Sequence, residues 1–144
     1  MGLIDVLQRF ANALAVTATG DATNVIDGRA TLTQFNGKPL VVVIHISVAA
    51  DAANSDETYA WSLTTDDNAA LSSDTTVATK TISRTLLTAN SIHTIDIPEN
   101  VNLEQFFGLV HTLGGTTPSV TYSAWIAEKG SLTSLVKFPN AYDA

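Results

Sequence analysis

The sequence predicts an all-β protein, an antiparallel β-sandwich whose simplest arrangement is a jelly roll. Three observations predict this class. Charge is sparse at 15% while Ser and Thr are plentiful, and such a balance favours sheet because β-branched residues fit a pleated surface. About eight short apolar or alternating runs are parted by turn signals, a spacing typical of sandwiches and barrels. No pattern recurs with a fixed period, which argues against a solenoid or a propeller.

The N-terminal residues carry the one helical pattern. Leu3, Leu7, Phe10 and Leu14 recur at spacings of four, three and four, and Ile4 lies on the same side. A helix this short is marginal alone, so its apolar stripe must dock, either on its own domain or on a neighbouring subunit. We therefore expect a short helical arm over residues 1–15, a sandwich over residues 16–130, and an extended tail over residues 131–144.

The strands are expected in a regular series between turn signals. Residues 40–48 form the strongest, and because their first half is apolar on both sides, this strand is expected to lie centrally between layers. The Thr65-Asp66-Asp67-Asn68 stretch is a turn whose side chains can hydrogen-bond the local backbone. The other expected strands are residues 17–19 and 23–26 at an edge, 58–65, 75–82 at an edge, and 91–97.

The uncharged stretch over residues 106–127 predicts an antiparallel hairpin around the Gly114–Pro118 turn. If Leu113 pairs with Ser119, aromatic residues meet aromatic or aliphatic residues across the strands, and Gly108 meets Ala124. That register places one set of side chains on the core face and puts His111 on the opposite face. The expected core set is Phe106, Val110, Val120, Tyr122 and Ile126.

Composition removes several classes of partner. The net charge of −7, with only seven basic residues, argues against binding a nucleic-acid backbone, and no apolar run reaches transmembrane length. The chain has no cysteine, so neither a disulfide framework nor a thiolate metal site can form. We expect no nucleic-acid partner and no membrane partner.

No residue pattern points to catalysis, and we predict that the protein is not an enzyme and needs no cofactor. No serine lies in a Gly-x-Ser-x-Gly elbow, and no glycine-rich phosphate loop precedes a helix. His45, His93 and His111 could bind zinc only if their strand faces coincided, so a place on the sheet surface or at an interface is favoured. The consecutive Asp66-Asp67-Asn68 lacks the distal glutamate of a calcium loop. Trp61 and Trp125 fit strand alternation as core residues, with a sugar-stacking platform as the alternative.

A set of motifs in this sequence resembles the capsid cement (decoration) proteins of tailed bacteriophages. The resemblance runs in the same order through most of the domain and stops after Gly130. The matching stretches are Met1-Gly2-Leu3-Ile4-Asp5, Ala15-Val16-Thr17-Ala18-Thr19, Thr23-Asn24-Val25-Ile26-Asp27, Pro39-Leu40-Val41-Val42-Val43, Leu63-Thr64-Thr65-Asp66-Asp67, Leu113-Gly114-Gly115-Thr116-Thr117-Pro118 and Ser123-Ala124-Trp125-Ile126.

The resemblance implies a jelly-roll protein that binds the outer surface of the capsid as a small homo-oligomer, a dimer or a trimer. It would be made in the host cytoplasm and would fasten neighbouring major capsid proteins in the virion. The expected contact residues are Leu3, Ile4, Leu7 and Phe10 in the arm, with Phe138 and Tyr142 in the tail. The alternative is a carbohydrate-binding sandwich, such as a binding module or an adhesive virion head, with Trp61 or Tyr59 on an exposed face.

Overall fold

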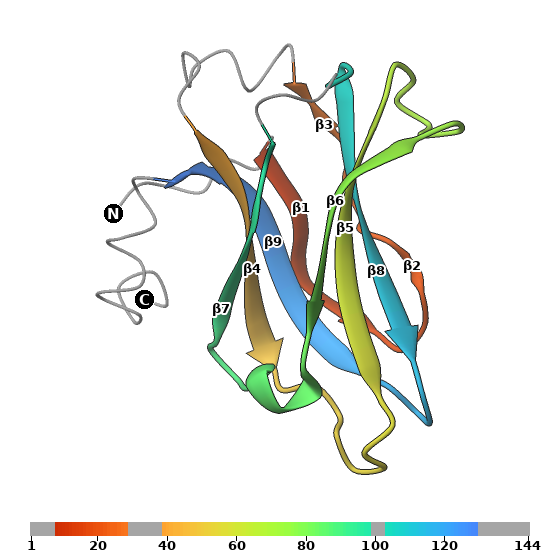
Figure 1. Ribbon diagram of the computed structural model, residues 1–144, viewed down its shortest axis with the longest axis vertical. Helices are drawn as coiled ribbons and strands as arrows, with labels where there is room; N and C mark the ends of the chain where they lie inside the picture. The colour runs from red at the N-terminus through yellow and green to blue at the C-terminus, as the bar shows by residue number, and fades with distance from the viewer. Residues whose placement is uncertain (1–7, 29–38, 99–102, 130–144) are drawn as a thin grey trace.

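Two antiparallel sheets face each other in the computed structural model, which describes residues 8–28, 39–98 and 103–129 (Figure 1). One sheet has the strand order β1-β9-β4-β7, and the other has the order β2-β8-β5-β6, with β3 also paired to β8. The strands are β1 (Arg9–Val16), β2 (Gly20–Asp21), β3 (Ile26–Asp27), β4 (Leu40–Val48), β5 (Thr58–Asp66), β6 (Thr75–Ile82), β7 (Ile92–Asp96), β8 (Phe106–Gly114) and β9 (Val120–Glu128).

This strand order is that of a jelly roll, so the predicted fold class is confirmed. The chain changes sheet on passing from β1 to β2, from β3 to β4, from β4 to β5, from β6 to β7, from β7 to β8 and from β8 to β9. Among the described strands, β5 and β6 form the one pair that is adjacent both in sequence and in a sheet. Because the chain passes repeatedly from one sheet to the other, each sheet contains strands from both ends of the chain.

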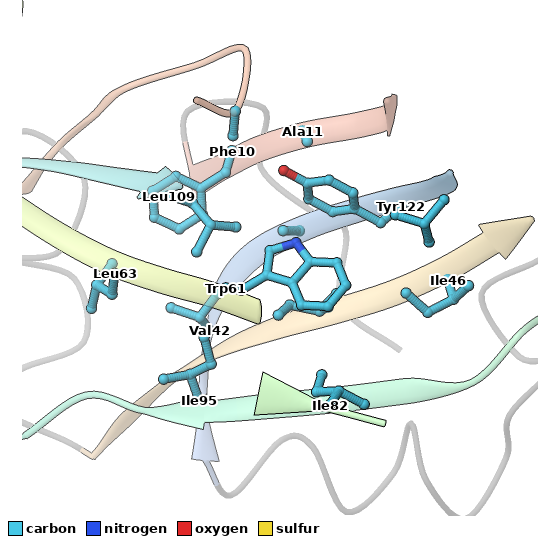
Figure 2. Close-up of a cluster of buried hydrophobic side chains, with 14 of the residues drawn as sticks. Phe10, Ala11, Val42, Ile46, Trp61, Leu63, Ile82, Ile95, Leu109 and Tyr122 are labelled. Atoms are coloured by element: carbon cyan, nitrogen blue, oxygen red, sulfur yellow. The ribbon is translucent and has the colours of Figure 1, made fainter. Parts of the chain in front are cut away.

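One hydrophobic core fills the space between the sheets. Trp61 of β5 lies at its centre and meets Tyr122 of β9 edge to face, with ring centroids 5.5 Å apart (Figure 2). The inward side chains of β4 are Val42, Ile44 and Ile46, which alternate along the strand as its sequence predicts. The central strand expected at residues 40–48 is therefore confirmed, since β4 lies between β9 and β7.

The expected N-terminal helix is absent from the described residues, and Arg9–Val16 instead forms strand β1 against β9. The register shifts twice, between Arg9 and Ala11 and between Ala11 and Leu14, and Ala13 has a positive φ of 49°. Such bulges insert extra residues, so core-facing positions lose their period of two and imitate helical spacing. The described part of the expected arm therefore belongs to the sheet.

The expected hairpin between β8 and β9 is also wrong, because the two strands lie in different sheets. β8 is paired on its two sides with β5 and with β2 and β3, while β9 is paired with β1 and β4. Neither strand has a free edge for the other, so the Gly114–Pro118 turn crosses between the sheets. Within the expected core set, Val120, Tyr122 and Ile126 are buried, but Phe106 and Val110 lie half-buried on the outward face of β8.

The other expected strands agree with the structure in part. β5, β6 and β7 lie within a residue or so of their predicted bounds, and β6 is an edge strand as expected. The edge strands expected at residues 17–19 and 23–26 are displaced by a few residues and shortened to β2 and β3. Within the residues that the structure describes, no helix is long and apolar enough to cross a membrane.

Candidate functional surfaces and buried polar groups

A histidine and a tyrosine join the two sheets inside the core. His111 projects inward from β8, and its Nδ1 lies 2.9 Å from the Tyr122 hydroxyl of β9. The two rings meet edge to face with centroids 5.7 Å apart, and both residues are buried. Gly20 lies opposite His111 on β2, and a Cβ there would meet the imidazole Nε2 at 3.4 Å. The inward position of His111 overturns the expectation that it lies on a sheet surface or at an interface.

Burial sets the protonation of this pair. It raises the pKa of Tyr122 well above its usual range, and the Asp21 carboxylate adds to the rise. The Trp61 indole N–H is buried without a hydrogen bond of good geometry, yet it lies near enough to the Tyr122 hydroxyl to oppose the rise in part. Burial also lowers the pKa of His111, against the opposing effect of Asp21. Both side chains are therefore neutral at neutral pH, and their hydrogen bond needs no charge.

The free energy of unfolding is expected to fall as the pH drops below about 6.5, the ordinary pKa of histidine. The unfolded chain takes up a proton on His111 there, whereas the folded protein does not until the pH reaches its lowered pKa. The slope is at most about 1.4 kcal/mol per pH unit for each such histidine. His93, whose pKa is also lowered by burial and by Lys80, adds to it. Urea unfolding between pH 7.5 and 5 measures the slope.

Nuclear magnetic resonance titration of the imidazole signals in the native protein shows which histidines cause this pH dependence of stability. The His111 signal should titrate below pH 6.5, and a His93→Asn variant should retain the His111 share of the slope. An unfolding free energy that stays flat over this range, with His111 titrating at or above 6.5, would contradict the assignment.

A network of loop contacts closes one end of the sandwich. Both carboxylate oxygens of Asp56 accept hydrogen bonds from Thr116, one from its backbone N–H at 3.1 Å and one from its hydroxyl at 2.8 Å. These bonds lower the pKa of Asp56. Asn54 adds contacts from its amide to the Thr116 carbonyl and the Thr117 hydroxyl, both at 3.3 Å. The crossing turn after β8 is thereby tied to the loop before β5.

The buried Tyr59 joins the loops at the same end of the sandwich through its hydroxyl group. Its hydroxyl donates to the Asp51 carbonyl at 2.8 Å and accepts from the Ser119 backbone N–H at 3.1 Å. Glu57 is buried beside it, with Oε1 accepting the Asn54 N–H at 2.9 Å and Oε2 without a hydrogen-bond partner. The polar side chains of these loops therefore mainly serve to hold the two loops together.

The acidic turn after β5 is structural as well. Asp66 accepts hydrogen bonds from the backbone N–H groups of Asn68 and Ser73, and the Ser73 bond is the main cause of its lowered pKa. Asn68 in turn accepts from the Ala70 N–H at 2.9 Å. This confirms the predicted turn with side chains bonded to the local backbone.

The three histidines do not converge. His111 faces the core from one sheet, whereas His45 on β4 lies on the outward face of the other. His93 on β7 lies opposite Ile44 and contacts the Ser91 hydroxyl at 3.1 Å. In residues 8–28, 39–98 and 103–129, no group of three or more His, Cys, Asp or Glu side chains is arranged to hold a metal ion.

The aromatic residues that suggested a sugar platform are buried. Trp61 and Tyr59 each have no exposed surface, and Trp125 is 5% exposed. The prediction that Trp61 is a core residue is confirmed. Trp125 belongs to a second cluster, with Val41 and Val43, on the outward face of the β1-β9-β4-β7 sheet. The carbohydrate alternative needed Trp61 or Tyr59 on an exposed face, and the structure contradicts that placement.

Among the predicted contact residues, only Phe10 lies within the described part of the chain. It is fully buried in the main core, so its role is packing, and it offers no surface to a partner. Leu3, Ile4, Leu7, Phe138 and Tyr142 lie outside the described residues. Sequence reasoning missed the His111–Tyr122 contact and the outward cluster. The apolar outward face of β4 was the one signal that could have revealed the cluster.

The described chain is a jelly-roll protein, with one four-stranded and one five-stranded sheet. Its buried polar groups mainly join strands and loops. A comparison with family models then assigns the chain: it belongs to the Bbp16 family, whose model matches residues 10–126. The match runs from β1 to β9 and marks the protein as phage-associated. No protein in the curated collection matches the chain.

Proposed function

We propose that the protein is a capsid cement, or decoration, protein that binds the outer surface of a tailed-bacteriophage capsid. It would fasten neighbouring major capsid proteins, as a homo-oligomer of two or three copies. The observation that carries the proposal is the match to the Bbp16 family, which is associated with bacteriophages. The chain also has the jelly-roll fold that its resemblance to cement proteins implies.

The build of the sandwich supports this role. A continuous core between the sheets and the Asp56–Thr116 contacts at one end make a body suited to act as a rigid spacer. Repeated symmetric contacts supply strength on a capsid, so each contact needs only modest affinity. The net charge of −7 suits a protein that stays clear of packaged DNA.

The proposed contacts to the major capsid protein lie at the two ends of the chain. They are Leu3, Ile4 and Leu7 before β1, with Phe138 and Tyr142 after β9. Phe10 is no longer among them because it lies in the core. The protein would be made in the host cytoplasm and would reside on the virion surface, without nucleic-acid or membrane partners.

Purified protein is expected to co-sediment with expanded capsids of its own phage that lack the decoration layer. Deleting residues 1–7 should weaken binding to the capsid by about tenfold or more, because every subunit of the oligomer loses the same apolar contacts and the losses add up. The deletion stops before Arg9, because removing β1 would unfold the sheet. Light scattering on the same samples reports the number of subunits.

A Leu86→Ser variant is the matched control, because Leu86 is exposed and lies within the described sandwich. It should bind as the parent does, and Phe138→Ser with Tyr142→Ser should bind more weakly. Failure of the parent protein to sediment with capsids, at concentrations where it remains folded, would refute the proposal.

A further inference from the structure

Two edge strands lie next to each other on one side of the sandwich. β6 is the last strand of one sheet and β7 is the last strand of the other, and the two strands contact each other (Figure 1). The free edge of a sheet presents unpaired N–H and C=O groups, to which a strand of another chain can pair. The groups that close these two edges therefore control whether copies of the protein can join strand to strand.

The hydrogen-bonding pattern identifies the backbone groups at the free edge of β7. Neighbouring antiparallel strands hydrogen-bond through alternate residues. The Ile46 N–H of β4 donates to the Ser91 carbonyl, which lies just before β7, and the register continues from there without a shift. Every second residue from Ser91 onward thus bonds to β4, and the residues between them point away. The Thr94 carbonyl, in the middle of β7, therefore points to the free edge.

The same reasoning identifies the free groups of β6. The Leu109 carbonyl of β8 accepts a hydrogen bond from the residue after β2, so the odd-numbered residues of β8 bond away from β5. By the register, the even-numbered residues of β5 bond to β8, and odd-numbered ones such as Trp61 bond to β6. Lys80 pairs with Trp61, so its backbone bonds to β5. The backbone groups of its neighbours Thr79 and Thr81 point to the free edge.

The Lys80 side chain joins the two edges. Lys80 lies directly opposite Trp61, whose side chain is in the core, so the lysine also leaves its strand on the core side. Its Nζ then donates to the Thr94 carbonyl of β7 at 3.0 Å. Lys80 thus spans the open side of the sandwich from one edge strand to the other, and it remains exposed to solvent.

β6 has few other features that would prevent pairing with another chain. Lys80 is the one charged residue within Thr75–Ile82, and the strand contains no proline. A register shift between Leu63 and Thr64 of β5 distorts the first half of the pair, but the ladder over residues 78–82 is regular. Short segments of high β-propensity, with little charge and no proline, readily pair with copies of themselves.

We propose that the free edge of β6 is a latent pairing surface for a second copy of this chain, and that Lys80 keeps it closed. A strand added beside β6 or β7 would cover the Lys80 ammonium group, and removing a charge from water is costly. A strand added to β7 would also have to displace Lys80 from the Thr94 carbonyl. Copies of the chain are thereby prevented from joining into one continuous sheet. The inference concerns the free protein and does not rest on the proposed function.

A Lys80→Thr variant tests this, because it leaves all eight residues of β6 uncharged. The variant is expected to form larger assemblies as its concentration rises, as measured by sedimentation velocity. The lag before thioflavin T fluorescence appears should shorten severalfold. Lys80→Gln, which keeps a donor but loses the charge, should associate in the same way and replaces Lys80→Thr if that variant fails to fold.

Lys129→Thr is the matched control. It also changes the net charge from −7 to −8, but its salt bridge to Asp96 is exposed and it lies outside β6. Greater net charge alone disfavours association, so a general charge effect would act in the opposite direction. The control and Lys80→Arg should both keep the subunit number of the parent protein.

A proline at the free edge identifies the strand that pairs. Adding Thr81→Pro to Lys80→Thr should restore the subunit number of the parent, because it removes an edge N–H and leaves the hydrogen bonds to β5 intact. Hydrogen exchange gives an independent measurement. In the parent, the Thr79 and Thr81 amides should exchange fast and the Lys80 amide slowly. In the assembly formed by Lys80→Thr, the Thr79 and Thr81 amides should become protected.

Four outcomes would overturn the proposal. Two of them concern the lysines: folded Lys80→Thr or Lys80→Gln that keeps the subunit number of the parent, and Lys129→Thr that associates as strongly as they do. The third is association that persists with Thr81→Pro, which would assign it to another surface. The fourth is slow exchange of the Thr79 and Thr81 amides in the parent, which would show that the edge is already paired.

Discussion

Replacing Trp61 with alanine is expected to lower the free energy of unfolding by about 3–5 kcal/mol, the usual cost of deleting a large buried aromatic side chain. Trp61 has no exposed surface and lies between the sheets at the centre of the core (Figure 2). The substitution removes its edge-to-face contact with Tyr122, at 5.5 Å and 78°, and leaves a cavity that close-packed neighbours can fill only in part. Urea unfolding followed by circular dichroism measures the loss.

Leu86→Ala is the control for this experiment, because Leu86 lies in a single-turn 3-10 helix and is 60% exposed. It should change stability by no more than about 0.5 kcal/mol. If Trp61→Ala cost no more than the control, the assignment of Trp61 to the centre of the core would be wrong.

Replacing Gly115 with alanine is expected to cost at least about 2 kcal/mol, through backbone strain and a steric clash together. Gly115 has a φ of +92°, a conformation that L-residues adopt only at a cost. A Cβ there would lie 2.4 Å from the Asp56 carbonyl oxygen and 2.7 Å from Glu57 Cα, and both are backbone atoms that cannot rotate away. The expected result is a lower urea midpoint with an unchanged slope.

Gly20→Ala is the matched substitution, since its Cβ would meet no heavy atom closer than His111 Nε2 at 3.4 Å. It should cost clearly less than Gly115→Ala. Equal stability of the two variants would show that the crossing turn tolerates a side chain, and that the contact between residues 115 and 56 is not tight.

The sequence predicts most strands because each one has a local signal. β4, β5 and β7 alternate apolar residues between recognisable turns, and inward burial follows that alternation. β1 escapes prediction because its two bulges replace the period of two with a spacing that imitates a helix. Local periodicity reports which face is buried, and it cannot report an irregular ladder.

Strand pairing is the second failure, and its cause is different. β8 and β9 look like an ideal hairpin because their residues match across a short turn, yet each is a central strand of its own sheet. Only the complete set of strands reveals that both edges of each are already occupied. The same error hid the His111–Tyr122 contact, because the two residues meet across the core from opposite sheets.

The position of β9 bears on how the chain is synthesised. β9 lies between β1 and β4, so the sheet that joins the first and last described strands has a gap until the final strand arrives (Figure 1). Pairing between segments so distant in sequence is slow, because the intervening chain must be ordered before the contact is gained. Residues leave the ribosome one at a time, and β1 must therefore wait, unpaired with β9, until Val120–Glu128 has left the exit tunnel.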